Sequence, residues 1–441
     1  MRRHSIHRAC DDFHRTSAAL TRRQLIGRGI AAGLTVYGAQ AMPIARVLEA
    51  ASAQAAAAPD APILVSVFMP GGCDLLDTLV PLDAYGAYAD KRGGLRVARP
   101  PQLGSTGLGV HPALTRGLGG GVAGLFARGQ VGFMPGIDYS NYDLSHFHSR
   151  HFWETGLITQ RQSPGWLGRW LDQAGSPDNP LQGIAMDWGM SPLLRSASAP
   201  VAAVSSPDDS QFWIPGVWGD SYECSMAAWG ELTAPRPAAP GPTAAYAAGR
   251  MAKDVADRLA PYRRNDGVDP LVGSVAYPED NQLGERLQHL AGMLDQPLGI
   301  RVAAVEADGD FDTHDNQKEG LAESLEQVSA ALAAFQADLE ARGLANRVLT
   351  FVWSEFGRRV EQNSTGTDHG AGGIAWVMGS RAKPGILCDY PDVRKLDSQG
   401  NLAVTLDFRR VYASLLEQWL GHEAEAVIPN AKAFGRLQLV R

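Results

Sequence analysis

Acidic and imidazole side chains gather in short segments of this sequence. Asp74 follows two glycines, and a later segment carries Asp308, Asp310, Asp312, His314 and Asp315. Four carboxylates and an imidazole within eight residues repel one another unless a cation holds them together. This spacing predicts a metal site with Asp74, Asp312 and His314 among its ligands. A solvated acidic turn is the alternative for the later segment, and a turn-capping aspartate is the alternative for Asp74.

A second pair of segments offers further ligands near the end of the chain. Glu355 and Arg358 follow an apolar run, and Asp368 and His369 stand in a glycine-rich stretch. A carboxylate and an imidazole in these places are suitable metal ligands. The guanidinium of Arg358 or Arg359 could bind an anionic substrate through two hydrogen bonds, although a surface salt bridge is the alternative.

Ser145 and His146 begin another candidate segment. A serine at a helix start could act as a nucleophile, because the helix N-terminus favours developing negative charge. The alternative is that Ser145 only caps the helix. His148 and His151 share a helix face, so they could bind a metal or lie on the surface.

The elements that must position these residues alternate along the chain. Apolar runs rich in β-branched residues predict strands at residues 63–69, 130–135, 301–305, 347–353 and 374–378. Helical spacing predicts helices at 145–155, 244–259, 285–294, 319–342 and 408–420. This alternation favours an α/β domain with a mainly parallel central sheet flanked by helices on both faces. Ligand sites of such sheets lie at the carboxyl ends of the strands. We expect one domain over residues 59–441, with a cap insertion at about 190–295.

The first 58 residues have the pattern of an export signal. Arg22 and Arg23 form a twin-arginine pair, a mildly apolar stretch follows, and residues 51–55 offer Ala-x-Ala cleavage sites. The apolar stretch is short and rich in glycine, whereas a membrane span needs about 20 apolar residues. We therefore expect the twin-arginine translocase as a partner, no stable membrane anchor, and a periplasmic or secreted location.

Charge and motif content exclude several classes of protein. The 441-residue chain carries a net charge of −7, and its leader holds eight arginines against three acidic residues, so the remainder is strongly acidic. Such a body does not suit nucleic acid, which is bound through clustered lysines and arginines. The sequence contains no P-loop, dinucleotide-binding, HExxH or GxSxG motif.

Several motifs, in this order, resemble the exported domain-of-unknown-function family fifteen-oh-one. The residues that carry the resemblance are Arg22-Arg23, Gly71-Gly72-Cys73-Asp74, Ser145-His146-Phe147, Gly165-Trp166-Leu167-Gly168-Arg169, Phe311-Asp312-Thr313-His314, Ser354-Glu355-Phe356-Gly357-Arg358 and Thr367-Asp368-His369-Gly370. The family is similar to the alkaline phosphatase and sulfatase superfamily. The resemblance implies an alkaline-phosphatase-like sheet with one or two metal sites at the strand ends.

The same resemblance implies roles for individual residues. Ser145 resembles the superfamily nucleophile, with His146 and Arg358 as further catalytic residues. The implied metal ligands are Asp74, Asp312, His314, Glu355, Asp368 and His369. The metal would be zinc or manganese rather than magnesium or calcium. Phe356 stands where the phosphatases usually have a histidine, and Asp310 and His314 have the wider spacing seen in phosphatases.

The function implied is an exported, metal-dependent hydrolase of phosphate or sulfate esters. Its substrate would be an anionic small molecule or a glycan ester. The alternative is a non-catalytic exported binding or scaffold protein that retains the fold.

Overall fold

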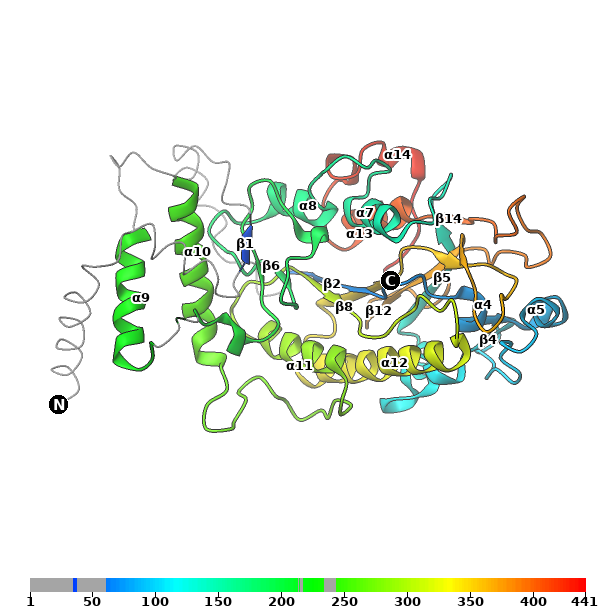
Figure 1. Ribbon diagram of the computed structural model, residues 1–441, viewed down its shortest axis with the longest axis horizontal. Coiled ribbons are helices and arrows are strands. Elements are labelled where there is room, and N and C mark those ends of the chain that lie inside the picture. The colour runs from blue at the N-terminus through cyan, green and yellow to red at the C-terminus, as the bar shows by residue number, and fades with distance from the viewer. Residues whose placement is uncertain (1–34, 38–60, 213, 215–216, 234–242) are drawn as a thin grey trace.

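A ten-stranded sheet forms the centre of the protein (Figure 1). The computed structural model describes residues 35–37, 61–212, 214, 217–233 and 243–441. The strands stand in the order β1 (Thr35–Tyr37), β7 (Val201–Ala203), β6 (Gly183–Ala185), β8 (Val302–Glu306), β2 (Ile63–Phe68), β9 (Val348–Trp353), β12 (Gly373–Met378), β5 (Val131–Asp138) and β13 (Gly385–Ile386), and β14 (Leu406–Asp407) also pairs with β5.

Most neighbouring strands of this sheet run parallel. The strands from β7 to β9 are all parallel to their neighbours, and β13 and β14 run parallel to β5. The exceptions are β1 at one edge and β12, which is antiparallel to both β9 and β5. The expected mainly parallel α/β sheet is therefore confirmed.

Helices cover both faces of the sheet, as the sequence pattern predicts. One face packs against α6 (Gly121–Ala127), α11 (Gln282–Leu294) and α12 (Gln317–Ala341). The other face packs against α7 (His146–Thr155), α8 (Trp166–Ala174), α13 (Phe408–Gln418) and α14 (Ala431–Phe434). In Figure 1, α7, α8, α13 and α14 lie above the strands, and α11 and α12 lie below them.

Strand β2 shows why these strands read as continuous apolar runs. Alternate side chains of a strand point to opposite faces of the sheet. Ile63, Val65 and Val67 pack in the core between the sheet and helices α11 and α12. Leu64 and Phe68 pack in the core between the sheet and helices α7 and α13. A strand that is buried on both faces needs apolar residues at nearly every position.

Short elements complete the edge at which β2 ends. Beyond β2 lie α4 (Leu75–Thr78) and α5 (Tyr85–Arg92) (Figure 1). Two small antiparallel sheets pair β3 (Leu79–Pro81) with β4 (Leu108–Val110), and β10 (Gly357–Arg358) with β11 (His369–Gly370).

The sheet topology brings the four candidate segments to this edge. Strands β8, β2 and β9 are parallel neighbours, so the loops that follow them leave the sheet at the same edge. Strand β12 runs the opposite way, so the segment before it, which contains His369, starts at that edge. Strand β5 is antiparallel to β12, and its carboxyl end leads to α7. Segments that are far apart in the sequence therefore meet here.

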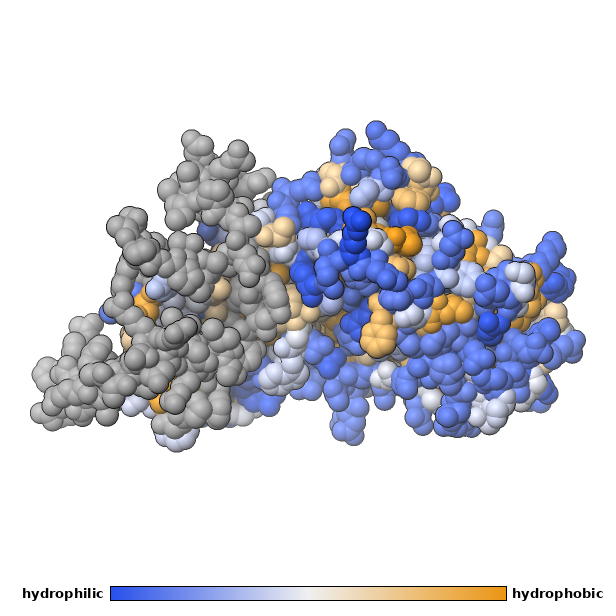
Figure 2. Space-filling model, turned by 45° about the horizontal axis from the view of Figure 1, so that its top comes forward, coloured by the Kyte–Doolittle hydropathy of each residue, from blue (hydrophilic) through white to orange (hydrophobic). Residues whose placement is uncertain are grey.

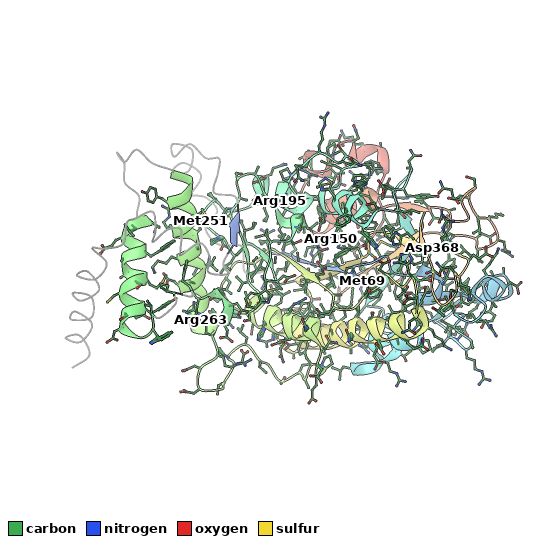
Figure 3. The ribbon with its side chains drawn as sticks, viewed as in Figure 1. Met69, Arg150, Arg195, Met251, Arg263 and Asp368 are labelled. Atoms are coloured by element: carbon green, nitrogen blue, oxygen red, sulfur yellow. The ribbon has the colours of Figure 1, made fainter. Side chains whose placement is uncertain are left out.

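The described part of residues 190–295 is not a separate insertion over the sheet. Strand β7 lies within this range and belongs to the sheet, while α11 packs against α12. The remaining helices, α9 (Asp220–Thr233) and α10 (Thr243–Leu259), share a small apolar cluster that includes Phe212 and Met226. Figure 3 shows Met251 of α10 and Asp368 toward opposite ends of the molecule, so α10 does not cover the candidate segments.

The surface of the described residues is mixed in character. Figure 2 shows mainly hydrophilic residues on the side facing the viewer, with small apolar patches between them. Among the described residues, no helix is both long and apolar enough to cross a membrane. The leader predicted at residues 1–58 lies outside the described residues, apart from the three residues of β1.

Candidate metal centre

Three histidines at the strand edge each have an oxygen near Nδ1, and for His146 and His369 this contact is a hydrogen bond. The pairs are His146 with Glu355 Oε1 at 2.8 Å, His369 with the Leu144 carbonyl at 2.7 Å, and His314 with Asp368 Oδ1 at 3.4 Å. Histidines that bind metals are usually fixed in this way, because a partner on one ring nitrogen sets the tautomer and aims the other nitrogen at the ion. The His146 and His369 rings are therefore oriented by groups behind them.

The Nε2 atoms of the same rings converge on Asp312. His314 Nε2 and His369 Nε2 each lie 3.1 Å from Asp312 Oδ1, and His146 Nε2 lies 3.3 Å from Asp312 Oδ2. One ligand atom each from His146, Asp312 and His369 lies within 4.8 Å of the others. The exposed ring of His314 adds another nitrogen, 2.9 Å from His369 Nε2.

These separations fit a shared cation. Two ligands at about 2.0–2.1 Å from a tetrahedral zinc ion lie about 3.3 Å apart. Two unprotonated imidazole nitrogens at 2.9 Å repel each other unless a proton or a cation lies between them. His146 Nε2 is buried and makes no hydrogen bond to the described residues, although Asp312 is near. A buried nitrogen without a hydrogen bond, close to the Asp312 carboxylate and the His369 ring, suits a metal ligand.

The Arg358 side chain holds Asp312 in this position. Its buried guanidinium donates to Asp312 Oδ1 and to the carbonyl oxygens of Gly71, Gly72 and Thr367. Burial alone would raise the pKa of Asp312, but the hydrogen bond and the charge of Arg358 lower it to about 2. Asp312 is therefore ionised at neutral pH. The sequence predicts that Arg358 binds substrate, whereas its donors are used inside the protein and it positions Asp312.

Glu355 lies behind His146, on the side away from Asp312. Its buried carboxylate accepts hydrogen bonds from the Gly71 N–H at 2.9 Å, the Gly72 N–H at 3.1 Å and the Ser354 hydroxyl at 3.1 Å. A side chain on Gly71 would meet the Asp312 nitrogen at 2.3 Å, and the positive φ of Gly71 also favours glycine. The sequence predicts Glu355 as a metal ligand, and the structure places it as the partner that orients His146.

The pKa values of the two half-buried imidazoles move in opposite directions. The hydrogen bond to Glu355 raises the pKa of His146, and burial lowers the pKa of His369. The ring of Phe356 packs against both, with centroid distances of 4.8 Å to His146 and 4.7 Å to His369. A phenyl ring cannot bind a metal ion, so Phe356 contributes packing to this centre.

Asp74 is placed apart from the three histidines. Its carboxylate caps α4 and is bound by the buried Arg92 and by Gln317 Nε2 at 2.7 Å. Arg92 also binds Asp77, whose pKa is raised to about 6, chiefly by burial. The oxygens of Asp74 are thus occupied by internal donors, so Asp74 is placed as a structural residue and not as the metal ligand that the sequence predicts.

The remaining candidates lie around the centre. Ser145 occupies the N-cap position of α7 without making the capping bond through its side chain. His148 Nδ1 pairs with Asp143 Oδ2 at 2.7 Å, and His151 Nε2 pairs with the Arg161 carbonyl at 3.1 Å, so neither ring belongs to the group around Asp312. Asp368 is half exposed and faces His314.

Comparisons with known proteins support a family. The model of the family described as "Protein of unknown function (DUF1501)" matches residues 242–427, which include Asp312, Glu355 and His369. The resemblance predicted from the motifs is confirmed over these residues. No curated protein matches the chain.

Two solved structures show a distant likeness. Alkaline phosphatase from the Antarctic bacterium TAB5 is 9% identical, with a TM-score of 0.32, and the match covers 73% of this chain and 91% of that chain. A mutant of the TAB5 alkaline phosphatase with Mg bound is 11% identical, with the same TM-score and the same coverage of both chains.

Proposed function

We propose that this protein is a metal-dependent hydrolase of phosphate or sulfate esters, with one centre held by His146, Asp312 and His369. The observation that carries the proposal is that three imidazoles aim Nε2 at one carboxylate, and that two of them, His146 and His369, are fixed by a hydrogen bond at Nδ1. His314 is the fourth ligand or the group that leaves when substrate arrives. A donor set dominated by imidazole nitrogen suits zinc better than magnesium or calcium, which prefer oxygen.

The metal would supply a Lewis acid that polarises the ester oxygens and activates a hydroxyl or water. The chain's own residues prepare the site. Arg358 keeps Asp312 ionised, and Glu355 accepts the Nδ1 proton of His146, which leaves the Nε2 lone pair facing Asp312. Phe356 restricts the movement of the two rings against which it packs. These contacts hold the site in one geometry before a substrate binds.

Ser145 is the nucleophile in this proposal. It is adjacent to His146 in the chain and begins α7, where the helix N-terminus favours an anionic oxygen. A free serine hydroxyl is a weak nucleophile and needs a metal or base beside it. Its lack of a capping bond leaves the hydroxyl available for attack.

Hydrolysis of an aryl phosphate and an aryl sulfate tests the proposal. Chelator-treated protein should be inactive, and zinc or manganese should restore turnover. His369→Gln should reduce kcat/KM by roughly a hundredfold or more, since it removes a ligand. His422→Gln is the matched control, because it makes the same change in a histidine that lies outside the proposed centre and pairs with the Glu423 carbonyl. If no metal gives turnover with either ester, a non-catalytic binding protein with the same fold replaces this proposal.

We also propose that the protein is exported by the twin-arginine translocase to the periplasm or beyond. The support is the Arg22–Arg23 pair, followed by a short apolar stretch and small-residue cleavage sites. The twin-arginine route carries folded cargo, which suits a protein whose metal is inserted before export.

A further inference from the structure

A small cavity lies between α7 and the sheet. Its volume is about 210 Å³. The charged and aromatic residues that line it are Phe68, Arg150, Glu154, Asp187, Glu306 and Trp353. Pockets for drug-sized ligands start at about 300 Å³, so this cavity suits a single small group.

Small side chains on three neighbouring strands create the space. Ser66 of β2 pairs with Ala304 of β8, and Ala304 pairs with Ala185 of β6, so these three lie in one row across the sheet. All three line the cavity. A larger side chain in this row would fill the room beneath α7.

The cavity and the candidate metal centre share α7 and the ends of the same strands. Arg150 follows His146 by four residues, so the two lie one turn apart on the same side of α7. The last residues of β2, β8 and β9 line the cavity, and the loops that follow these strands carry Gly71, Asp312 and Glu355. Figure 3 shows Arg150 beside α7, between Arg195 and Asp368 along the molecule.

The charges in the lining restrict what the cavity can hold. Arg150 donates to Glu154 at 2.9 Å and to Glu306 at 2.7 Å, and its guanidinium lies over Phe68 at 4.5 Å. With Asp187, three carboxylates face one guanidinium, so an anionic group is repelled. A cation would have to compete with Arg150 for Glu154 and Glu306. A purely apolar group would leave these charged groups without water or a partner.

We propose that the cavity binds the alcohol part of the ester, and that this part is a single sugar ring or a similar polyol. The proposal rests on the hydrolase function above and names its substrate class. Each hydroxyl can donate to a carboxylate while it accepts from the guanidinium. Such a ligand is neutral and polar on every side, which matches a small cavity with both acceptors and a donor. The phosphate or sulfate group would then face the metal centre.

Binding of unphosphorylated ligands to the full-length protein tests this inference. We expect glucose to bind the wild-type protein, detected by saturation-transfer NMR, and ethanolamine to bind at least tenfold more weakly. Ala304→Leu replaces a methyl group with an isobutyl group inside the cavity and should weaken glucose binding at least tenfold. Ala433→Leu makes the same change at an exposed position of α14 and should bind glucose normally.

A second variant tests the inference if Ala304→Leu folds poorly. Asp187→Asn removes one carboxylate from the lining and should weaken glucose binding severalfold. The inference is overturned if the wild-type protein does not bind glucose, if Ala304→Leu binds glucose as tightly as the wild-type protein does, or if ethanolamine binds more tightly than glucose. Because free glucose is the probe, the result does not depend on turnover. Aryl ester hydrolysis without glucose binding refutes the cavity proposal alone, and glucose binding without any hydrolysis refutes the hydrolase alone.

Discussion

Replacing Glu355 with glutamine should weaken metal binding while leaving the three direct ligands in place. The Glu355 carboxylate accepts the Nδ1 proton of His146 at 2.8 Å, together with the N–H groups of Gly71 and Gly72. Glutamine offers one acceptor oxygen and an amide that can only donate. The glutamine NH₂ group would therefore face at least one of these three donors, which in the wild-type protein donates to a carboxylate oxygen.

Two magnitudes follow from this loss. Removing an outer partner of a metal-binding histidine lowers metal affinity by about 10–100-fold, which corresponds to about 1.4–2.7 kcal/mol. A buried N–H group left without an acceptor also costs about 1–3 kcal/mol of unfolding free energy. If Glu355 were itself a ligand, its replacement would instead abolish tight binding.

Competition with a chromogenic chelator measures the zinc affinity of the two proteins. We expect the Glu355→Gln dissociation constant to rise by between one and two orders of magnitude. Glu361→Gln removes a carboxylate that is 73% exposed and pairs loosely with Lys91, so it should bind zinc like the wild-type protein. Unchanged affinity in Glu355→Gln would refute its role in orienting His146, and complete loss of zinc would make it a ligand.

Three further predictions concern other parts of the molecule. Ser145→Ala should abolish ester hydrolysis but keep the metal and the fold, and retained turnover in a folded variant would remove Ser145 from the mechanism. Burial raises the pKa of Asp138 to about 8, so its proton stabilises the folded state fully below about pH 4, and this contribution is lost as the pH rises to about 8. The free energy of unfolding of the wild-type protein, measured with a chemical denaturant, should therefore fall relative to that of Asp138→Asn by up to about 1.4 kcal/mol per pH unit as the pH rises through that range. A difference between the two proteins that does not change with pH would contradict the shift. Replacing both Arg22 and Arg23 with lysine should leave precursor in the cytoplasm, as seen by fractionation, and normal export would exclude the twin-arginine route.

The strands and helices were predictable because their signals are local. The run at 63–69 is apolar at almost every position, which is required of a strand buried on both faces, and β2 occupies Ile63–Phe68. Helices such as α12 carry apolar residues at helical spacing. The direction of β12 was not predictable, because a strand has the same apolar pattern whether its neighbours run parallel or antiparallel.

The location of the site was also predictable, since parallel strands bring their carboxyl ends to one edge. The roles within the site were not. Glu355 reads as a ligand in the sequence, yet it holds His146 from behind, and Asp368 lies 3.4 Å from Nδ1 of His314 rather than beside Asp312. A carboxylate suits either role, and only the position of the imidazole between it and Asp312 distinguishes them.

Asp74 shows a second reason for the difference. Its partners are Arg92, which lies 18 residues away, and Gln317, which lies 243 residues away. Neither partner has a spacing that a local motif can reveal. Arg358 is similar, because the sequence shows a guanidinium near acidic residues but does not show that it is buried and bonded to backbone carbonyls.

The metal content of the purified protein tests the central claim most directly. Full-length protein equilibrated with zinc and then dialysed should retain one zinc ion per chain when measured by mass spectrometry. His369→Gln and Asp312→Asn should lose this zinc, whereas Asp74→Asn should keep it if the variant folds. A wild-type protein that retains no metal, or a zinc content that depends on Asp74 and not on Asp312 and His369, would contradict the centre described above.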